Sequence, residues 1–293
     1  MSTFGDYVEL VRAPAILTVL GDTAAGAAAA GRLLRGRRLG LPLASACLYA
    51  GGMALNDYAD RDVDARERPE RPIPSGRISA RRALGTASAL TAAGLGLCAL
   101  AGGRGALALG IPLAASIWTY DLAAKKHSLI GAVSMGSCRA LDVLMGAGAG
   151  HVRQALGAAG IMGGHTVAVT LLSQGEVEGT DAATASGVAA TTGLLTGALM
   201  AGSVGPPARM LPMLAATAAY AVRCAPAQLR AARNPVAQNA LEATKAGIRA
   251  MVPLQTALAL RYGHPAAAGA LVAVDVVGRI LRSRPGGRKV SES

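Results

Sequence analysis

Three oxygen-bearing side chains stand four residues apart in the chain. Asn56, Asp60 and Asp64 belong to the run NDYADRDVD. Positions four apart lie only about 40° apart around an α-helix, so these side chains would form one ridge, with Asp57 and Asp62 on other faces. Like charges at this spacing repel each other unless a cation lies between them, and Mg²⁺ prefers oxygen ligands. The spacing therefore predicts that the ridge binds Mg²⁺, whose remaining ligands would be water and a substrate phosphate.

The loop that follows this ridge carries basic residues suited to binding phosphate. It reads RERPERPIPSGRIS over residues 66–79, and prolines on either side of Ile73 stiffen it. Arg68 and Arg71 could close over a phosphate, because a guanidinium group presents several donors in a planar fork. The alternative interpretation is a solvated basic loop that only obeys the charge rule for membrane topology.

A second basic element lies at the end of a later apolar run. There Lys125 follows Tyr120 by five residues in the sequence TYDLAAKK. Lysine supplies a compact point charge for a phosphate, so this element is a further candidate for phosphate binding. The alternative is a pair of interfacial residues that anchor the run in a membrane.

A second acidic loop reads SQGEVEGTD over residues 173–181. Its Glu176, Glu178 and Asp181 offer another set of oxygen ligands. Two metal sites on facing loops could clamp one diphosphate, with each ion neutralising the leaving group. The alternative is a solvated acidic loop without a ligand.

The composition predicts that these loops join membrane-spanning helices. Of the 293 residues 52% are hydrophobic and only 16% are charged, which is too apolar for an ordinary soluble domain. The 38 glycines suit close packing of helices in lipid. The net charge of +12 does not indicate a nucleic-acid partner, because the basic residues lie mostly in short loops without an aromatic-rich module.

The apolar runs give an expected order of spans. We expect them near residues 8–30, 41–58, 82–101, 105–121, 128–149, 154–173, 184–204, 208–223, 240–262 and 265–281. The count becomes nine if 208–223 or 265–281 is not a full span. The distribution of basic residues places both termini and both acidic loops in the cytoplasm. Four arginines within residues 32–38 conflict with this topology.

Several charged residues fall inside the expected spans. Such charges are costly in lipid and usually face the interior of a helix bundle. Arg139 and Asp142 are three residues apart and could pair on one helix face. Arg12 and Lys245 are candidates to face the same cavity as the metal ridge.

The loop motifs resemble the first signature of the UbiA superfamily of intramembrane prenyltransferases. The similarity covers the ridge and the following Arg-Pro-Ile-Pro-Ser-Gly-Arg-Ile-Ser segment at 71–79. Arg12-x-Pro14 is similar to the N-terminal pattern of that family, and Tyr120 with Lys125 to its tyrosine–lysine element. The resemblance implies an all-α bundle of nine or ten transmembrane helices around a central cavity, formed by residues 1–293 as one membrane domain.

The second acidic loop departs from the family pattern. Ser173 stands where that pattern has its first aspartate, and Glu176 where it has the second. Glu176 and Asp181 are the best matches for metal ligands in this loop. The stretches 136–144 and 173–177 are similar to the EboC-like branch of the superfamily.

The resemblance implies an integral, multi-pass membrane enzyme that binds membrane lipid. We expect it in a bacterial cell membrane and without a nucleic-acid partner. Its expected reaction is Mg²⁺-dependent transfer of a prenyl group from an isoprenyl diphosphate to an unidentified lipid-soluble or aromatic acceptor. The residues expected to act in catalysis are Asp60, Asp64, Tyr120 and Lys125. The residues expected to bind substrate are Arg12, Asn56, Arg68, Arg71, Tyr120, Lys125, Arg139 and Lys245. The expected metal ligands are Asn56, Asp60, Asp64, Glu176 and Asp181.

Three other functions fit parts of the pattern. A CDP-alcohol phosphatidyltransferase also uses membrane aspartates spaced by four, but its upstream Asp-Gly-x₂-Ala-Arg segment is missing from residues 41–55. A transporter could use the intramembrane charges as an ion path. A catalytically silent scaffold would keep the fold and tolerate the altered second loop. Release of diphosphate from an allylic substrate separates the enzyme from the last two.

Overall fold

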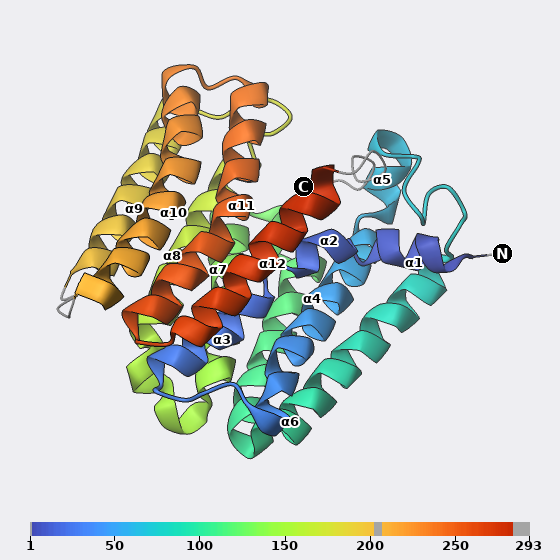
Figure 1. Cartoon of the computed structure of the whole chain (residues 1–293). Coiled ribbons are helices and arrows are strands. Elements are labelled where there is room, and N and C mark those ends of the chain that lie inside the picture. The colour runs from blue at the N-terminus through green and yellow to red at the C-terminus, as the bar shows by residue number, and fades with distance from the viewer. Residues whose placement is uncertain (1, 202–206, 284–293) are drawn as a thin grey trace.

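The computed structural model describes residues 2–201 and 207–283, and this part of the chain is built from helices and their connections without a strand (Figure 1). The α-helices are α1 (Phe4–Leu10), α2 (Ala13–Ile16), α3 (Leu20–Ala29), α4 (Gly40–Ala59), α5 (Arg61–Glu67), α6 (Ala80–Leu122), α7 (Ser128–Ala147), α8 (Val152–Ser173), α9 (Ala182–Met200), α10 (Pro207–Arg233), α11 (Ala237–Arg261) and α12 (Pro265–Ser283). Short 3₁₀ turns at Gly36–Leu39, Ala124–Lys126 and Ala149–His151 join some of them. The predicted all-α bundle is confirmed.

Most predicted spans coincide with one long helix each. The runs at 41–58, 128–149 and 154–173 correspond to α4, α7 and α8, within a few residues at either end. The run at 184–204 corresponds to α9, although its last three residues lie outside the described part of the chain. Five helical stretches of the described residues are long and apolar enough to cross a membrane, judged by length and composition. Apolar periodicity and length therefore located these helices correctly.

Helix α6 combines two of the predicted spans. Its backbone leaves the helical region at Gly103, where φ is 65° and ψ is −159°, a conformation that favours glycine. The two halves then pack against each other, because Trp118 Nε1 donates a hydrogen bond of 3.2 Å to Thr91 Oγ1. The ribbon descends from Ala80 and returns toward Leu122 (Figure 1). The chain thus forms a helical hairpin at the gap predicted between 82–101 and 105–121.

The prediction of one span over residues 8–30 is wrong. This segment forms three short helices, α1, α2 and α3, with breaks around Arg12 and before Leu20. Figure 1 shows α1 and α2 lying across the end of the bundle, whereas α3 enters it. Arg12 has φ 47° and ψ 51°, and it is the only non-glycine residue of the described chain with positive φ. The break matters because it brings the Arg12 side chain to the end of α4.

Small residues bring α3 and α7 into direct backbone contact. A Cβ added to Gly26 would lie 1.7 Å from the carbonyl oxygen of Val143, and one added to Gly146 would lie 2.1 Å from that of Thr23. No side chain fits at either position. This is the close packing that the abundance of glycine predicts for helices in lipid.

Two of the four arginines that conflict with the predicted topology have a structural role. Arg38 Nη2 donates to the Gly146 carbonyl oxygen at 2.8 Å, and Arg32 Nη1 donates to that of Ala147 at 3.3 Å. The last carbonyl groups of a helix have no partner within it, so basic side chains stabilise them. These two arginines therefore cap α7, which accounts for part of the basic cluster at 32–38.

Both acidic loops lie at the same end of the bundle. Helix α5 carries the first, and the connection from α8 to α9 carries the second (Figure 1). Thr180 N donates to Pro235 O at 2.9 Å, which ties the second loop to the connection between α10 and α11. The loop from α3 to α4 lies at the opposite end of the bundle. This arrangement gives the bundle one end rich in acidic and basic side chains near its interior.

Candidate active site

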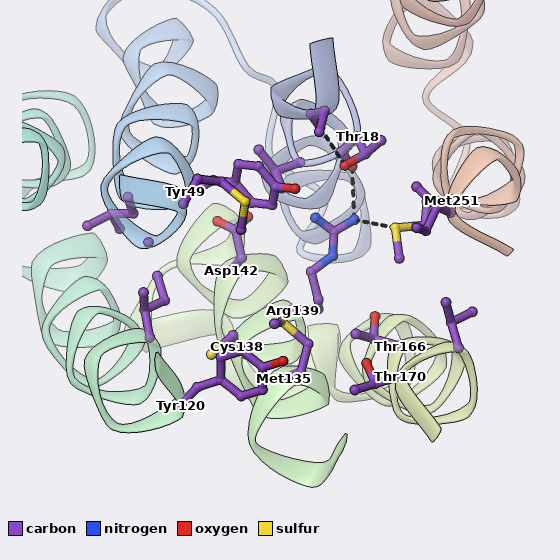
Figure 2. Close-up of a pocket in the computed structure, with 18 of the residues that line it drawn as sticks. Thr18, Tyr49, Tyr120, Met135, Cys138, Arg139, Asp142, Thr166, Thr170 and Met251 are labelled. Carbon is purple, nitrogen blue, oxygen red and sulfur yellow. Dashed lines mark hydrogen bonds between the residues drawn. The ribbon is translucent and has the colours of Figure 1, made fainter. Parts of the chain in front are cut away.

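A cavity of about 320 Å³ opens inside the bundle beneath the acidic loops. Its wall comes from α4, α6, α7, α8 and α11, together with residues near the break between α2 and α3 (Figure 2). Much of the lining is apolar, with Leu48, Met53, Leu113, Ile117 and Met135 among it. The polar and charged lining includes Tyr49, Tyr120, Asp121, Arg139, Asp142, Ser173, Glu176 and Thr244. The cavity thus joins an apolar chamber to groups that can bind charge.

Lys125 bridges two residues of the predicted ridge. Its Nζ lies 2.7 Å from Asp60 Oδ1 and 3.0 Å from Asn56 Oδ1. The lysine comes from the 3₁₀ turn after α6, whereas its partners lie at the end of α4. The ammonium therefore lies between the two oxygens, where the sequence predicts a metal cation.

The third ridge residue pairs with an arginine of the proline-rich loop. Arg71 Nη1 lies 2.7 Å from Asp64 Oδ2 and 3.4 Å from Asp57 Oδ1. Arg12 Nη2 also contacts Asp57 Oδ1, at 3.3 Å. Asp57 and Asp64 are both only 4% exposed, so these charges lie in a buried network. The structure brings Arg12, Arg71 and the ridge together, as the sequence predicts.

One detail of the predicted ridge is wrong. The helix does not continue through it, because α4 ends at Ala59 and α5 begins at Arg61, with Asp60 between them at φ −91° and ψ 2°. Asp57 was not predicted as a site residue, yet Arg71 joins it to Asp64 in the same buried network, whereas the Asp62 side chain is 83% exposed. Asp57 was missed because its main partner, Arg12, lies 45 residues earlier in the chain.

The backbone at Arg12 stores strain next to this network. A left-handed conformation of a non-glycine residue costs on the order of 1–3 kcal/mol and persists only where its surroundings impose it. Here the guanidinium contact with Asp57 and the start of α2 accompany that conformation. The Arg-x-Pro pattern contains the sequence signal, because proline stands in the first turn of α2, where it favours helix initiation.

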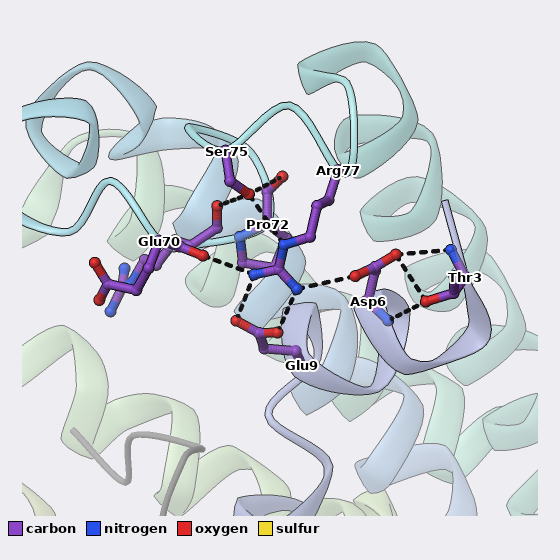
Figure 3. A network of polar contacts seen from close by, with 8 residues as sticks. Thr3, Asp6, Glu9, Glu70, Pro72, Ser75 and Arg77 are labelled. Atoms are coloured by element: carbon purple, nitrogen blue, oxygen red, sulfur yellow. Dashed lines mark hydrogen bonds and ion pairs between the residues drawn. The ribbon is translucent and has the colours of Figure 1, made fainter. Parts of the chain in front are cut away.

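Arg77 ties α1 to the loop that carries Arg71 (Figure 3). Its Nη1 and Nη2 donate to the two oxygens of Glu9 at 2.6 and 2.9 Å, and Nη1 also donates to Asp6 Oδ1 at 2.9 Å. Its Nη2 reaches the backbone oxygen of Glu70 at 2.6 Å. Thr3 and Asp6 form a capping box at the start of α1, and these bonds to Thr3, together with Arg77, lower the pKa of Asp6. The N-terminal helix and the loop therefore form one unit beside the site.

The second acidic loop contributes Glu176 to the cavity wall. Its Oε1 is buried without a hydrogen-bond partner among the described residues, and so is the neighbouring Thr244 Oγ1. Burial raises the pKa of Glu176, and the positive charges of Lys245 and Arg68 oppose this rise. The charge of Arg68, from the first loop, therefore acts on a carboxyl group of the second loop, so the two predicted loops lie near each other.

Asp181 has a different environment from Glu176. It is the exposed N-cap residue of α9, and its Oδ1 accepts from Thr184 N at 2.8 Å while Oδ2 accepts from Thr184 Oγ1 at 2.6 Å. These bonds lower the pKa of Asp181. Both oxygens are thus engaged at the helix start, so the geometry favours Glu176 over Asp181 as a metal ligand.

The predicted pairing of Arg139 with Asp142 is wrong. Arg139 Nη1 lies 3.0 Å from Asp22 Oδ2. Arg139 Nη2 donates to Thr18 O at 2.9 Å (Figure 2). Asp142 instead accepts a hydrogen bond from Ser45 Oγ. Helix α3 packs on α7 and so supplies the partner from 117 residues away. Arg139 nevertheless lines the cavity, as predicted for a substrate-binding residue.

The donor set fits a Mg²⁺ ion that shares its ligands with a substrate. Asn56, Asp60, Asp64 and Glu176 offer only hard oxygens, and the buried Oε1 of Glu176 has no partner in the described chain. No three His, Cys, Asp or Glu side chains of the described residues converge closely enough to hold a metal alone. Mg²⁺ commonly takes one or two carboxylates and completes its shell with water and phosphate oxygens, so this geometry is compatible with it.

Comparison with solved structures supports the fold. The chain is similar to a UbiA homologue from Archaeoglobus fulgidus bound to DMAPP and Mg²⁺, with a TM-score of 0.64 and 15% identity over 92% of this chain and 99% of that one. It is also similar to a digeranylgeranylglyceryl phosphate synthase structure, with a TM-score of 0.57 and 17% identity over 88% of this chain and 98% of that one.

Sequence comparison gives more similar relatives over shorter stretches. Digeranylgeranylglyceryl phosphate synthase of Methanopyrus kandleri is 39% identical over 141 residues, which are 45% of this chain and 50% of that protein. The synthase of the same name from Ignicoccus hospitalis is 41% identical over 145 residues, 48% of this chain and 46% of that protein. The chain thus spans about half the length of the named relatives that it matches. A family model described as the UbiA prenyltransferase family matches residues 16–240, so the chain belongs to that family.

Proposed function

We propose that this chain transfers a prenyl group from an isoprenyl diphosphate to an acceptor within the membrane, with Mg²⁺ as cofactor. One observation carries the proposal: a network of carboxylates and cations lies beside an apolar cavity whose wall includes Tyr120, Asp121 and Glu176. A prenyl diphosphate has the matching form, with a charged head and an apolar tail. The solved relatives from Archaeoglobus fulgidus, bound to DMAPP or GPP with Mg²⁺, support this choice of donor.

Basic residues at the mouth would bind the diphosphate. Lys125 and Arg71 are now engaged with Asp60 and Asp64, and both could turn to phosphate oxygens if Mg²⁺ takes over the carboxylates. Arg68 of the first loop and Lys245 of α11 lie near Glu176 and would add positive charge there. Tyr120, which lines the cavity one turn before Lys125, would orient the head group. Arg12 would hold Asp57 in place for Arg71.

The metal ligands would be Asn56, Asp60 and Asp64 from the first loop and Glu176 from the second. When bound, Mg²⁺ would neutralise the negative charge that develops on the leaving diphosphate. We assign Asp181 to the cap of α9 rather than to the metal.

The apolar chamber would protect the reacting prenyl group. Departure of the diphosphate leaves an allylic cation, which water would convert to the alcohol. A cavity lined by leucine, isoleucine and methionine excludes water and accepts the isoprenoid tail from the bilayer. The reaction needs no covalent enzyme nucleophile, so the residues of the mouth and the chamber suffice.

The two archaeal relatives are named for a product that carries two geranylgeranyl chains on glyceryl phosphate. We therefore propose geranylgeranyl diphosphate and a prenylated glyceryl phosphate as the first pair of substrates to test. The charge distribution of the loops supports a cytoplasmic position for the cavity mouth.

The test uses the purified protein in lipid nanodiscs. It is incubated with Mg²⁺ and with labelled dimethylallyl, geranyl or geranylgeranyl diphosphate, together with a total lipid extract. We expect release of diphosphate that stops on chelation of Mg²⁺, and a lipid product heavier by the mass of the prenyl group. A protein that releases no diphosphate from any of the three donors would be a silent scaffold or a transporter, and the proposal would be wrong.

A further inference from the structure

Asp121 is a buried carboxyl group that the proposed diphosphate site does not use. It lies one residue before the end of α6, is 3% exposed and lines the cavity. A Cβ added to Gly52 of α4 would lie 3.7 Å from Asp121 Oδ2. Gly52 lines the same cavity, so the carboxyl group faces the chamber between α4 and α6.

Asp121 differs from the other carboxylates of the mouth in its partners. Asp57 contacts Arg12 and Arg71, Asp60 contacts Lys125, and Asp64 contacts Arg71. Within the described part of the chain, the Asp121 carboxyl group takes part in no hydrogen bond or salt bridge. The charged groups that act on it most are Lys125, Asp60, Arg12 and Asp57. Of these, Lys125 already pairs with Asp60, and Arg12 already pairs with Asp57. A buried polar group without a partner is destabilising unless a ligand supplies a hydrogen-bond donor.

The position of Asp121 in the cavity indicates which ligand group would supply this hydrogen-bond donor. The residue stands between the charged mouth, where Lys125 lies four positions later, and the apolar chamber lined by Ile117 and Leu113. The head of a prenyl diphosphate would lie at the mouth and its tail in the chamber, so the bond that breaks would lie near Asp121. Any acceptor that attacks this carbon must bring its reacting atom to the same place.

We propose that Asp121 removes the proton of the prenyl acceptor, and that the acceptor reacts through a hydroxyl group. This inference rests on the proposed prenyl transfer and adds to it the residue that takes the acceptor proton. The bond between C1 of the prenyl group and the diphosphate oxygen breaks, and its electron pair leaves with the diphosphate. A lone pair of the hydroxyl oxygen forms the new bond to C1, and the hydroxyl proton passes to a carboxylate oxygen of Asp121. The product is an ether.

Asp142 lines the same cavity but is less suited to this role. It already accepts a hydrogen bond from Ser45, and it shares Arg139 and Asp22 in one buried network. It also lies on α7 beside Arg139, whereas Asp121 precedes the lysine that would bind the diphosphate. The geometry therefore points to Asp121 as the base.

The test compares Asp121→Asn with the wild-type protein in nanodiscs, using geranylgeranyl diphosphate as donor. Geranylgeranylglyceryl phosphate serves as the hydroxyl acceptor, and 4-hydroxybenzoate serves as an acceptor that reacts at a ring carbon. We expect the variant to bind the donor as tightly as the wild type and to form the ether with a kcat lower by about 10²–10⁴-fold, the usual contribution of a positioned base. Its melting temperature should not fall, because the substitution removes an unpaired buried carboxyl group.

A second variant separates loss of the base from a structural defect in Asp121→Asn. Asp121→Ala leaves space for a small carboxylate, and added formate should restore part of the ether formation. The exposed Asp62→Asn substitution on α5 serves as the control. It should leave unchanged the rate of transfer to the hydroxyl acceptor and the rate of transfer to 4-hydroxybenzoate. Full activity of Asp121→Asn, no rescue by formate, or wild-type transfer to the ring carbon alone would overturn the inference while leaving prenyl transfer in place. A wild-type protein that releases no diphosphate would overturn both.

Discussion

Arg77 and Glu9 are joined by two parallel hydrogen bonds of 2.6 and 2.9 Å, although 68 residues separate them in the sequence. This contact connects α1 to the proline-rich loop, and Arg71 of that loop holds Asp64 and Asp57. Arg12 follows α1 and reaches the same Asp57. The network at the cavity mouth is thus assembled from an N-terminal helix and a loop that are fixed to each other outside the cavity.

The first prediction concerns this contact. Arg77→Ala should lower the melting temperature and weaken donor binding, because α1 and the loop would no longer hold Arg12 and Arg71 in register. A double-mutant cycle with Glu9→Gln should give a coupling free energy of about 1 kcal/mol, since the pair is bidentate but partly exposed. The neighbouring exposed Arg81→Ala substitution is the control. Additive effects of the two substitutions would show that the pair does not stabilise the site.

The second prediction separates donor binding from acceptor binding. Lys125→Ala removes the ammonium that now bridges Asn56 and Asp60. Hydrogen bonds to charged groups contribute about 1.5–3 kcal/mol, so the dissociation constant for geranylgeranyl diphosphate should rise by roughly 10- to 100-fold. The affinity for the acceptor should change little. Calorimetric titration in nanodiscs measures both constants, and an unchanged donor constant would remove Lys125 from the site.

A third prediction follows from the raised pKa of Glu176. Burial raises this pKa above its usual 4.5, so the folded protein holds the proton more tightly than the unfolded chain does. The resulting stabilisation is fully present below the usual pKa and is lost as the pH rises through the raised value. Glu176→Gln cannot lose a proton, so its melting temperature relative to wild type should increase from about pH 4 to about pH 7.

This measurement is made in the presence of a chelator, so that no metal stabilises the ionised form. The exposed neighbour Glu178 provides the matched control, and Glu178→Gln should show no such trend. A difference between Glu176→Gln and wild type that stays constant with pH would contradict the buried environment of Glu176.

The fourth prediction distinguishes the two acidic residues of the second loop. Asp181→Ser keeps an oxygen that can cap α9, because serine is a favoured N-cap residue, but it removes the carboxylate. We expect stability and Mg²⁺-dependent turnover close to those of the wild type. Asp181→Ala should be less stable than Asp181→Ser, because it lacks the cap. A large loss of turnover in Asp181→Ser would return Asp181 to the metal site.

The sequence predicted the helices well because their signals are local. Apolar runs of about twenty residues separated by glycine and charge gave the limits of α4, α7 and α8, and the gap at Gly103 gave the hairpin in α6. The broken first span was missed because its break depends on Arg12, a residue without a strong preference for the left-handed conformation. Only the following proline hinted at a helix start there.

Part of the candidate site could also be predicted, because its signal is local in the sequence. Regular spacing revealed Asn56, Asp60 and Asp64, and the structure places Arg12, Arg71 and Lys125 against this ridge. Spacing gave a wrong prediction where the partner of a charged residue lies far away in the sequence. Arg139 pairs with Asp22 of α3 instead of the residue three positions along its own helix. Asp57 and Asp121 were overlooked because their burial depends on how α4, α6 and the N-terminal segment pack.

The central claim is that the acidic mouth binds a prenyl diphosphate through Mg²⁺, and Asp60→Asn tests it most directly. The affinity of geranylgeranyl diphosphate is measured for this variant, for the wild type and for the exposed control Asp62→Asn, with and without Mg²⁺. The account predicts that Mg²⁺ tightens binding and permits diphosphate release in the wild type and the control, while Asp60→Asn stays folded in the membrane and shows neither effect. Equal affinity and turnover in Asp60→Asn and the wild type would contradict it.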